Sequence, residues 1–249
     1  MNNTFEKEFA LRYFEMNKQG TITPSSMLTL LEETAADHCE IIDHSLYQLG
    51  NKNMGWVLVS GCLEMYRYPK YKENIIIKTW MSEYSSVKGI RENIIYDERR
   101  NVIGKAKGLW IFFDISRRRP IRIFEEIKTK WSSFEEVSIA CDLGKVIPEI
   151  ESGDIKTKIK VQRYDTDMNE HVNNIRYLDW LMDSIPKNYI ENYALTAIDG
   201  RFLGEARLKD RLINYTRKGS EENSFLHTIK NIDTNKVCAT AITHWSPIN

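Results

Sequence analysis

Apolar residues recur at helical spacing in two stretches of the chain, and each stretch begins at a helix-start signal. The first helix is predicted near Pro24–Leu49, where Thr23 can cap the amino terminus and Pro24 suits the first helical position. The second is predicted near Val172–Ile185, with apolar residues almost all round the helix until Pro186 ends it. Both helices are therefore expected to be buried against a sheet.

Segments rich in β-branched and aromatic residues follow each helix and predict strands. The strands predicted after the first helix are Trp56–Met65, Asn74–Trp80, Ile90–Asp97 and Ala106–Asp114. Those predicted after the second helix are Leu195–Leu203, Leu212–Arg217, Ser224–Ile232 and Val237–Trp245. Each half also opens with an Arg-Tyr pair, Arg12-Tyr13 and Arg163-Tyr164. The shared order of strand, long helix and four strands indicates an internal duplication.

One helix followed by an antiparallel meander, present twice, predicts an α+β architecture in which each curved sheet wraps its own helix. This is the hot-dog arrangement, so the predicted fold is a tandem, or double, hot-dog. The connector, roughly Arg117 to Lys160, is charged, has a short helical pattern around Ile123–Trp131, and is expected to follow the surface. We assign an N-terminal domain with this connector to residues 1–145 and a C-terminal domain to residues 146–249.

The composition is that of a globular protein, with 42% hydrophobic and 28% charged residues among 249. The 35 basic and 35 acidic residues cancel, so no overall field attracts nucleic acid or an anionic membrane. The longest apolar runs are far shorter than the ~20 residues of a membrane helix. Since the amino terminus resembles neither a signal nor a transit peptide, we expect a cytoplasmic protein without membrane insertion.

The cysteines, Cys39, Cys62, Cys141 and Cys238, are scattered and form no CxxC motif. The five histidines are equally dispersed, so neither a zinc site nor a disulfide framework is indicated. We therefore predict four reduced thiols, and we expect neither a metal nor a cofactor.

Asp167, Asn169 and His171 occupy alternate positions immediately before the second helix. In an extended segment their side chains would project to one side and could form a site. Short polar side chains at a helix start are also common caps, so the residues alone leave both interpretations open. The corresponding stretch of the first half, Glu15–Gly20, has an acid and an amide but no histidine.

Glu205 is a further candidate, in a segment that resembles a strand. A carboxylate facing the sheet interior would be unfavourable unless it is used or paired. On pattern alone, pairing with Arg201 or Arg207 on a solvated face is the simpler interpretation.

The segment from Arg163 to Trp180 resembles the signature of acyl-acyl carrier protein thioesterases, whose C-terminal hot-dog domain carries D-x-N-x-H-V-N-N-x-x-Y. Segments of the first half are also similar to that family: Tyr13 and Glu15, Trp56-Val57-Leu58, Arg67-Tyr68-Pro69-Lys70, Thr79-Trp80 and Arg118-Arg119-Pro120. The resemblance covers nearly the whole chain and suggests a bacterial-type member without the plastid-targeting extension of plant members.

This resemblance implies that the protein hydrolyses the thioester of acyl-acyl carrier protein, releases a free fatty acid and terminates fatty acid synthesis. Asp167, Asn169 and His171 fall on the motif, and Glu205 falls on the family's downstream catalytic acid. Ala206 stands where plant members commonly have cysteine, so a thiol nucleophile is not expected. The N-terminal domain would hold the acyl chain.

Thioester hydrolysis needs a nucleophile, stabilisation of an oxyanion and a proton for the leaving sulfur. We assign Asn169, with a backbone N–H at the helix start, to the thioester carbonyl, and His171 to positioning water or moving the proton. Either Glu205 or Asp167 would act as general base or attack directly, and the sequence leaves that choice open.

Three alternatives remain: an acyl-CoA thioesterase of the same superfamily, a hydratase acting on an acyl thioester, and a non-catalytic fatty-acyl-binding protein. Because acyl carrier protein is acidic, a basic patch could bind it. The candidates are Arg117, Arg118, Arg119, Lys128 and Lys130, although an ordinary solvated charge run explains them equally well. The chain is expected to be a monomer or a homodimer.

Overall fold

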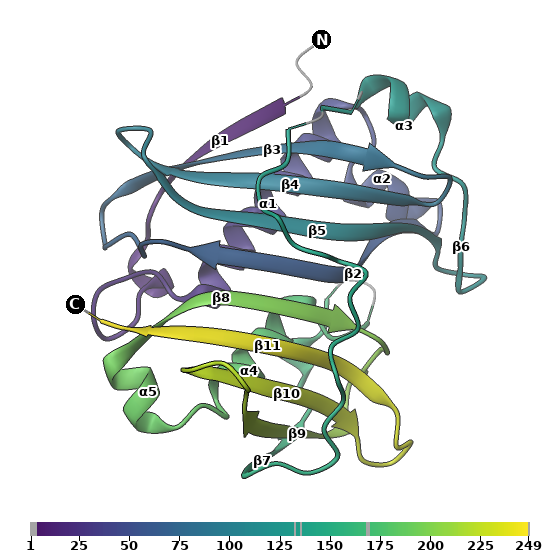
Figure 1. Cartoon of the computed structure of the whole chain (residues 1–249). Coiled ribbons are helices and arrows are strands. Elements are labelled where there is room, and N and C mark those ends of the chain that lie inside the picture. Colours follow the sequence, from purple (N-terminus) through teal and green to yellow (C-terminus); the bar gives the residue numbers. More distant parts are fainter. Residues whose placement is uncertain (1–3, 132, 135, 168–169, 249) are drawn as a thin grey trace. The chain divides into compact units, whose positions relative to one another are not determined.

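The computed structural model describes residues 4–131, 133–134, 136–167 and 170–248. The chain divides into two compact units, Met1–Leu143 (unit 1) and Gly144–Asn249 (unit 2). In each unit an antiparallel sheet wraps around a central helix (Figure 1), so each unit is a hot-dog. The predicted α+β tandem hot-dog is confirmed. No helix in the described part of the chain is both long enough and apolar enough to cross a membrane.

The sheet of unit 1 has the order β1, β3, β4, β5, β2, with β6 paired to β5. Its strands are β1 (Thr4–Ala10), β2 (Met54–Met65), β3 (Asn74–Tyr84), β4 (Lys88–Asp97), β5 (Val102–Asp114) and β6 (Arg119–Pro120). Every pair is antiparallel, and Ile77 of β3 lies opposite Ile95 of β4. Both side chains are fully buried, which fixes the register because a one-residue slip would expose them.

The helices of unit 1 are α1 (Pro24–Ile41), α2 (Leu46–Asn51) and α3 (Glu125–Lys130). Thr23 caps α1 as predicted, since its hydroxyl accepts a hydrogen bond from the Ser26 N–H. The prediction of one helix through Leu49 is wrong, because Asp43 adopts a left-handed φ of 59° and Ser45 starts α2 with a capping box. Neither feature alters the apolar spacing on which the prediction rested.

The sheet of unit 2 has the order β8, β11, β10, β9, β7. Its strands are β7 (Ile155–Lys160), β8 (Tyr193–Phe202), β9 (Arg211–Lys218), β10 (Ser224–Asn231) and β11 (Val237–Pro247). Its helices are α4 (Asn174–Met182) and α5 (Lys187–Asn192). Tyr177, Trp180 and Leu181 of α4 are buried in the core of this unit, as the wide apolar arc predicts.

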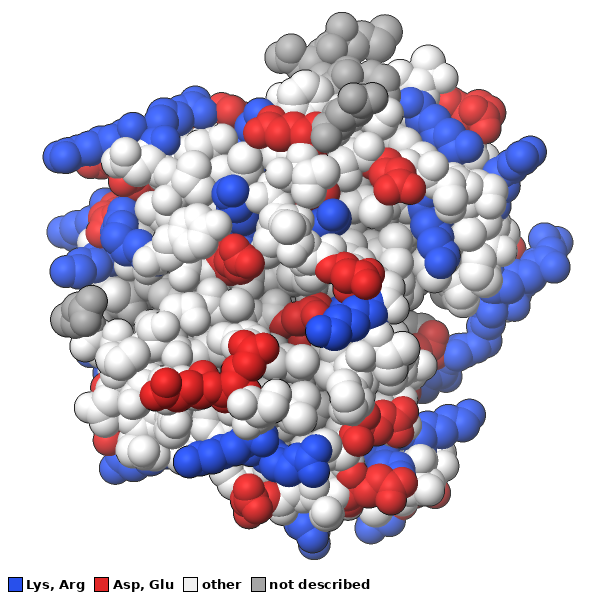
Figure 2. Space-filling model, viewed as in Figure 1, with Lys and Arg blue, Asp and Glu red and all other residues white. Residues whose placement is uncertain are grey.

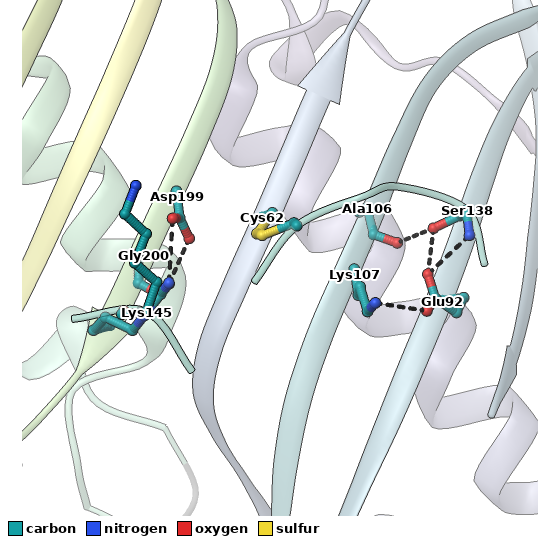
Figure 3. The surroundings of a disulfide bond; sticks show 10 residues. Cys62, Glu92, Ala106, Lys107, Ser138, Lys145, Asp199 and Gly200 are labelled. Atoms are coloured by element: carbon teal, nitrogen blue, oxygen red, sulfur yellow. Dashed lines mark hydrogen bonds and ion pairs between the residues drawn. A yellow bond between two sulfur atoms is a disulfide. The ribbon is translucent and has the colours of Figure 1, made fainter. Parts of the chain in front are cut away.

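The connector is attached to the sheet of unit 1 by buried contacts (Figure 3). Glu92 of β4 is fully buried, and its carboxylate accepts hydrogen bonds from the Ser138 N–H at 3.1 Å and the Ser138 hydroxyl at 2.5 Å. A disulfide then joins Cys141 to Cys62 of β2. The prediction of four reduced thiols is therefore wrong for this pair. Cys39 and Cys238 are free and buried.

Candidate functional site

Asp167 and His171 of the motif pair across a turn before α4. A β-bridge pairs Thr166 with Val172, and the Asp167 N–H donates to the His171 carbonyl at 2.9 Å. Glu170 has a left-handed φ of 62°, and its N–H donates to the Asp167 carbonyl at 3.1 Å. These backbone hydrogen bonds pair Asp167 with His171 across a turn, instead of the extended segment considered from the sequence. Asn169 lies outside the described residues.

Unit 1 contains the same turn without the same chemistry. Asn17 donates its N–H to the Thr21 carbonyl at 2.8 Å, and Gly20 has a φ of 75°. Asn17 therefore corresponds to Asp167 and Thr21 to His171. Aligning the two units by these turns therefore shifts the alignment by one residue from the one that superimposes the two Arg-Tyr pairs. Of the two equivalent turns, the one in unit 2 carries the histidine and the acid.

Glu205 reaches the motif turn from the connection between β8 and β9, not from a strand as predicted. Backbone contacts hold the two segments together, because the Val172 N–H donates to the Ala206 carbonyl at 2.9 Å and His171 forms a β-bridge with Arg207. Tyr177 of α4 has a hydrogen bond with the backbone of Ala206, and burial raises the pKa of its hydroxyl above the usual range. Tyr177 therefore stays protonated and helps to position this connection.

Three side chains meet where these segments join. His171 Nε2 lies 3.5 Å from Glu205 Oε2, and Arg207 Nη2 lies 3.3 Å from His171 Nε2 and 3.8 Å from Glu205 Oε2. Glu205 pairs with exposed Arg207, as the simpler sequence interpretation expected, and it also faces the motif histidine. Arg201, the other partner considered, binds Asp199 instead.

The triangle restricts where a proton can reside. A guanidinium only donates hydrogen bonds, so His171 Nε2 accepts from Arg207 when the imidazole is neutral. When Nε2 is protonated it can donate to Glu205 instead. This geometry would allow a proton to pass between His171 Nε2 and the carboxylate of Glu205.

The remaining motif residues have different positions. Asp167 is exposed at the other end of the turn from His171. Asn173 caps α4 by accepting a hydrogen bond from the Ile175 N–H at 2.8 Å, the ordinary role that its position also allowed. Arg207 is the residue that the sequence interpretation missed as part of the site, although its place two residues after Glu205 had marked it as an ion-pair partner. Within the described residues of either unit taken alone, no three His, Cys, Asp or Glu side chains have metal-ligand spacing.

The candidate docking residues differ in their surroundings. Arg117, Arg118 and Arg119 are exposed in and beside the turn between β5 and β6. Lys128 lies 3.1 Å from Glu125, and Lys130 lies 3.1 Å from Glu126. Charges of both signs are also interspersed over the face shown in Figure 2. Arg117 is also paired, with Asp114 at 3.8 Å, but its side chain is far more exposed than those of Lys128 and Lys130.

Comparison with protein families identifies both halves of the chain. The model of the acyl-ACP thioesterase N-terminal domain matches residues 2–131, and the model of the C-terminal domain matches residues 149–247. Together they include the turn at His171 and the connection at Glu205.

Individual relatives are distant in sequence but similar in fold. Oleoyl-acyl carrier protein thioesterase 2 of Arabidopsis thaliana is 26% identical over 226 residues, which cover 83% of this chain and 61% of that protein. The chain thus spans less than two thirds of that relative. An acyl-ACP thioesterase from Bacteroides thetaiotaomicron has a TM-score of 0.88 at 20% identity and 98% coverage of both chains. The 12:0-ACP thioesterase of Umbellularia californica has a TM-score of 0.88 at 17% identity, covering 100% of this chain and 99% of that one.

Proposed function

Because this chain belongs to the acyl-ACP thioesterase family, we propose that it hydrolyses the thioester of acyl-acyl carrier protein and releases a free fatty acid. Its place would be the termination of fatty acid synthesis. The observation that carries the proposal is the 3.5 Å approach of His171 Nε2 to Glu205 Oε2. These are the histidine and the acid that the family signature nominates, and they come from separate segments of unit 2.

Glu205 acts as the general base in this proposal. Its carboxylate takes a proton from water, and the water oxygen forms a bond to the thioester carbonyl carbon. The tetrahedral intermediate then collapses as the carbon–sulfur bond breaks, and the proton passes through His171 to the leaving sulfur. Glu205 is preferred to Asp167 because its side chain approaches the imidazole, whereas the approach of Asp167 to His171 is between backbone atoms.

Arg207 and Asn169 complete the proposed site. The guanidinium of Arg207 holds the neutral imidazole with Nε2 unprotonated, ready to accept the proton that Glu205 has taken. Asn169 is assigned to the thioester carbonyl from the family resemblance. Neutral donors near a helix start suit the developing oxyanion.

We also propose a division of labour between the domains. The C-terminal domain, residues 146–249, would perform the hydrolysis, and the N-terminal domain, residues 1–145, would hold the acyl chain. The location of the described site residues in unit 2 supports the first part. The buried apolar cluster beneath α1 in unit 1, which includes Phe112 and Trp131, supports the second.

Acyl carrier protein would dock on exposed Arg117, Arg118 and Arg119, with Lys128 and Lys130 contributing less because their side chains are less exposed. We propose that the enzyme works in the cytoplasm as a monomer or homodimer. In that compartment thiol reductants would act on the Cys62–Cys141 disulfide.

A thiol-release assay tests the proposal directly. Wild-type protein is given equal concentrations of an acyl-acyl carrier protein, the same acyl group on coenzyme A, and an enoyl thioester. We expect the carrier-protein substrate to have the highest kcat/KM. Preference for the coenzyme A substrate would indicate the acyl-CoA thioesterase alternative, and hydration of the enoyl thioester would indicate a hydratase. Acyl binding without release of thiol would indicate a binding protein.

A further inference from the structure

The connection that carries Glu205 is held through one peptide group. The peptide between Ala206 and Arg207 accepts a hydrogen bond at its carbonyl oxygen from the Val172 N–H at 2.9 Å. Its N–H, which belongs to Arg207, donates to Asp210 Oδ2 at 3.0 Å. Because a peptide group is planar, these two bonds on opposite sides fix the orientation of the whole group. The motif turn provides one of the bonds and Asp210 provides the other.

Asp210 is itself attached to the core of unit 2. Its N–H donates to the Arg207 carbonyl at 3.0 Å and closes a turn in which Lys209 has a left-handed φ of 74°. The Val161 N–H donates to the Asp210 carbonyl at 3.0 Å, and the Lys209 N–H donates to the Val161 carbonyl at 3.1 Å. Val161 is buried in the core of this unit. We call the two hydrogen bonds between Asp210 and Arg207 the acid clamp.

Unit 1 has the same acid clamp at the equivalent connection, between β2 and β3. There the Ile22 N–H donates to the Pro69 carbonyl at 2.9 Å, as the Val172 N–H does to the carbonyl of Ala206 in unit 2. The next N–H, that of Lys70, donates to Glu73 Oε1 at 3.0 Å, and the Glu73 N–H donates to the Lys70 carbonyl at 3.1 Å. The clamping acid of unit 1 is therefore Glu73.

The two clamps differ in what else binds the acid. In unit 1 the second oxygen of Glu73 accepts from Arg67, whose Nη1 lies 2.7 Å from Oε2. Gly204 takes the place of Arg67 in unit 2, and a Cβ at Gly204 would lie 2.9 Å from the Val237 carbonyl oxygen. A side chain is excluded there, so no arginine can draw the carboxylate of Asp210 away from its peptide.

The clamped peptide carries two groups of the candidate site. Arg207 follows it directly, and its Nη2 lies 3.3 Å from His171 Nε2. Glu205 lies on the other side of Ala206, and its Oε2 lies 3.5 Å from the same nitrogen. Both Glu205 and Arg207 are exposed, so their placement depends on the backbone that carries them more than on packing. A rotation of this peptide would move both groups relative to the imidazole.

We propose that Asp210 is a positioning residue for the hydrolysis. Its carboxylate sets the orientation of the peptide before Arg207, and this peptide aligns Glu205 and Arg207 with the imidazole. The effect on turnover rests on the proposed function. The effect on the backbone is measured by hydrogen exchange of the Val172 N–H, which needs no substrate. A wild type that releases no thiol would refute the hydrolysis, whereas the exchange would still decide whether Asp210 holds the connection.

The test compares Asp210→Ala and Asp210→Asn with the wild type. Asp210→Ala removes the acceptor, and kcat for the carrier-protein substrate should fall roughly tenfold or more with little change in KM. The Val172 amide should exchange at least about fivefold faster, because its acceptor peptide has lost the second of its two bonds. Asp210→Asn keeps a weaker, neutral acceptor, so both quantities should lie between those of the wild type and Asp210→Ala.

Glu73→Ala is the matched control, because it opens the acid clamp of unit 1. It should speed exchange of the Ile22 amide and leave kcat and Val172 exchange at their wild-type values. Wild-type kcat in folded Asp210→Ala, unchanged Val172 exchange, or an equal loss of kcat in Glu73→Ala would each overturn the proposal. If Asp210→Ala does not fold, Asp210→Asn decides, since wild-type kcat or wild-type Val172 exchange in that variant would overturn it.

Discussion

The carboxylate of Glu205 faces Nε2 of His171 at 3.5 Å, although the two residues belong to separate connections of unit 2. The contact exists because the backbone of Ala206 is bound to the turn before α4 and to Tyr177. Arg207 approaches the same imidazole nitrogen at 3.3 Å. A carboxylate, an imidazole and a guanidinium are thus held together by one set of backbone contacts.

Replacing Arg207 should impair catalysis without impairing folding. We expect Arg207→Ala to lower kcat by roughly tenfold to a hundredfold with a smaller change in KM, because the neutral imidazole loses its fixed donor. Added guanidinium ion should restore part of the lost kcat, a response that a purely structural role would not give. Wild-type kcat in folded Arg207→Ala would remove Arg207 from the site.

Charge reversal at the proposed docking surface should affect one substrate class. Arg118→Glu combined with Arg119→Glu should raise KM for the carrier-protein substrate and weaken its salt dependence. A small thioester should be hydrolysed as before. Lys128→Glu is the comparison, since its charge is already paired with Glu125 and its effect should be smaller. Equal effects on both substrates would argue against docking at these arginines.

The disulfide should contribute to stability and not to catalysis. It closes a loop with a sequence separation of 79 residues, for which loop entropy gives roughly 4 kcal/mol. Dithiothreitol should therefore lower the Tm of the wild type but not that of Cys62→Ala, Cys141→Ala. Turnover per folded molecule should persist with all four cysteines replaced. Loss of turnover in that folded protein would revive a thiol mechanism.

A buried histidine in unit 2 should make stability depend on pH. Burial lowers the pKa of His227 to about 3, and both ring nitrogens bond to hydroxyls, of Thr216 and Thr243. The unfolded state takes up the proton near pH 6.5 and the folded state only near pH 3, so folding is weakened as pH falls between these values. At pH 4.5 the loss should be roughly 2–3 kcal/mol.

The measurement is urea unfolding at pH 7 and pH 4.5. His227→Gln should reduce the difference between the two free energies of unfolding. If the free energy of unfolding falls by the same amount from pH 7 to pH 4.5 in the wild type and in His227→Gln, groups other than His227 cause the loss of stability in acid.

The sequence predicts regular elements well because their signal is local. The predicted Ser224–Ile232 and Asn74–Trp80 differ from β10 and β3 by a few terminal residues, since alternation and β-branching extend along each strand. The break between α1 and α2 was missed because it depends on the left-handed backbone of Asp43. Glu170 produced the same kind of error at the site, since nothing but its backbone marks the turn.

The remaining errors concern contacts between distant segments. The Cys62–Cys141 disulfide depends on the path of the connector across the sheet of unit 1, which no spacing reveals. Arg91 reads as an ordinary charge within a strand, yet it is buried beside His38. For the candidate site, the sequence and the family resemblance nominated His171 and Glu205 and offered Arg207 only as an ion-pair partner of Glu205. The approach of Arg207 to His171 emerged from the fold.

Catalysis at the His171–Glu205 site is tested most directly by comparing the kcat of His171→Ala with the kcat of Thr21→Ala. Thr21 occupies in unit 1 the place that His171 occupies in unit 2, so the pair controls for changes to the turn itself. We predict that His171→Ala, like Glu205→Gln, Asp167→Asn and Asn169→Ala, folds normally and loses roughly 10² or more in kcat. Thr21→Ala and Glu15→Gln should keep most activity. Near-wild-type kcat in His171→Ala, or an equal loss in Thr21→Ala, would contradict catalysis at the His171–Glu205 site.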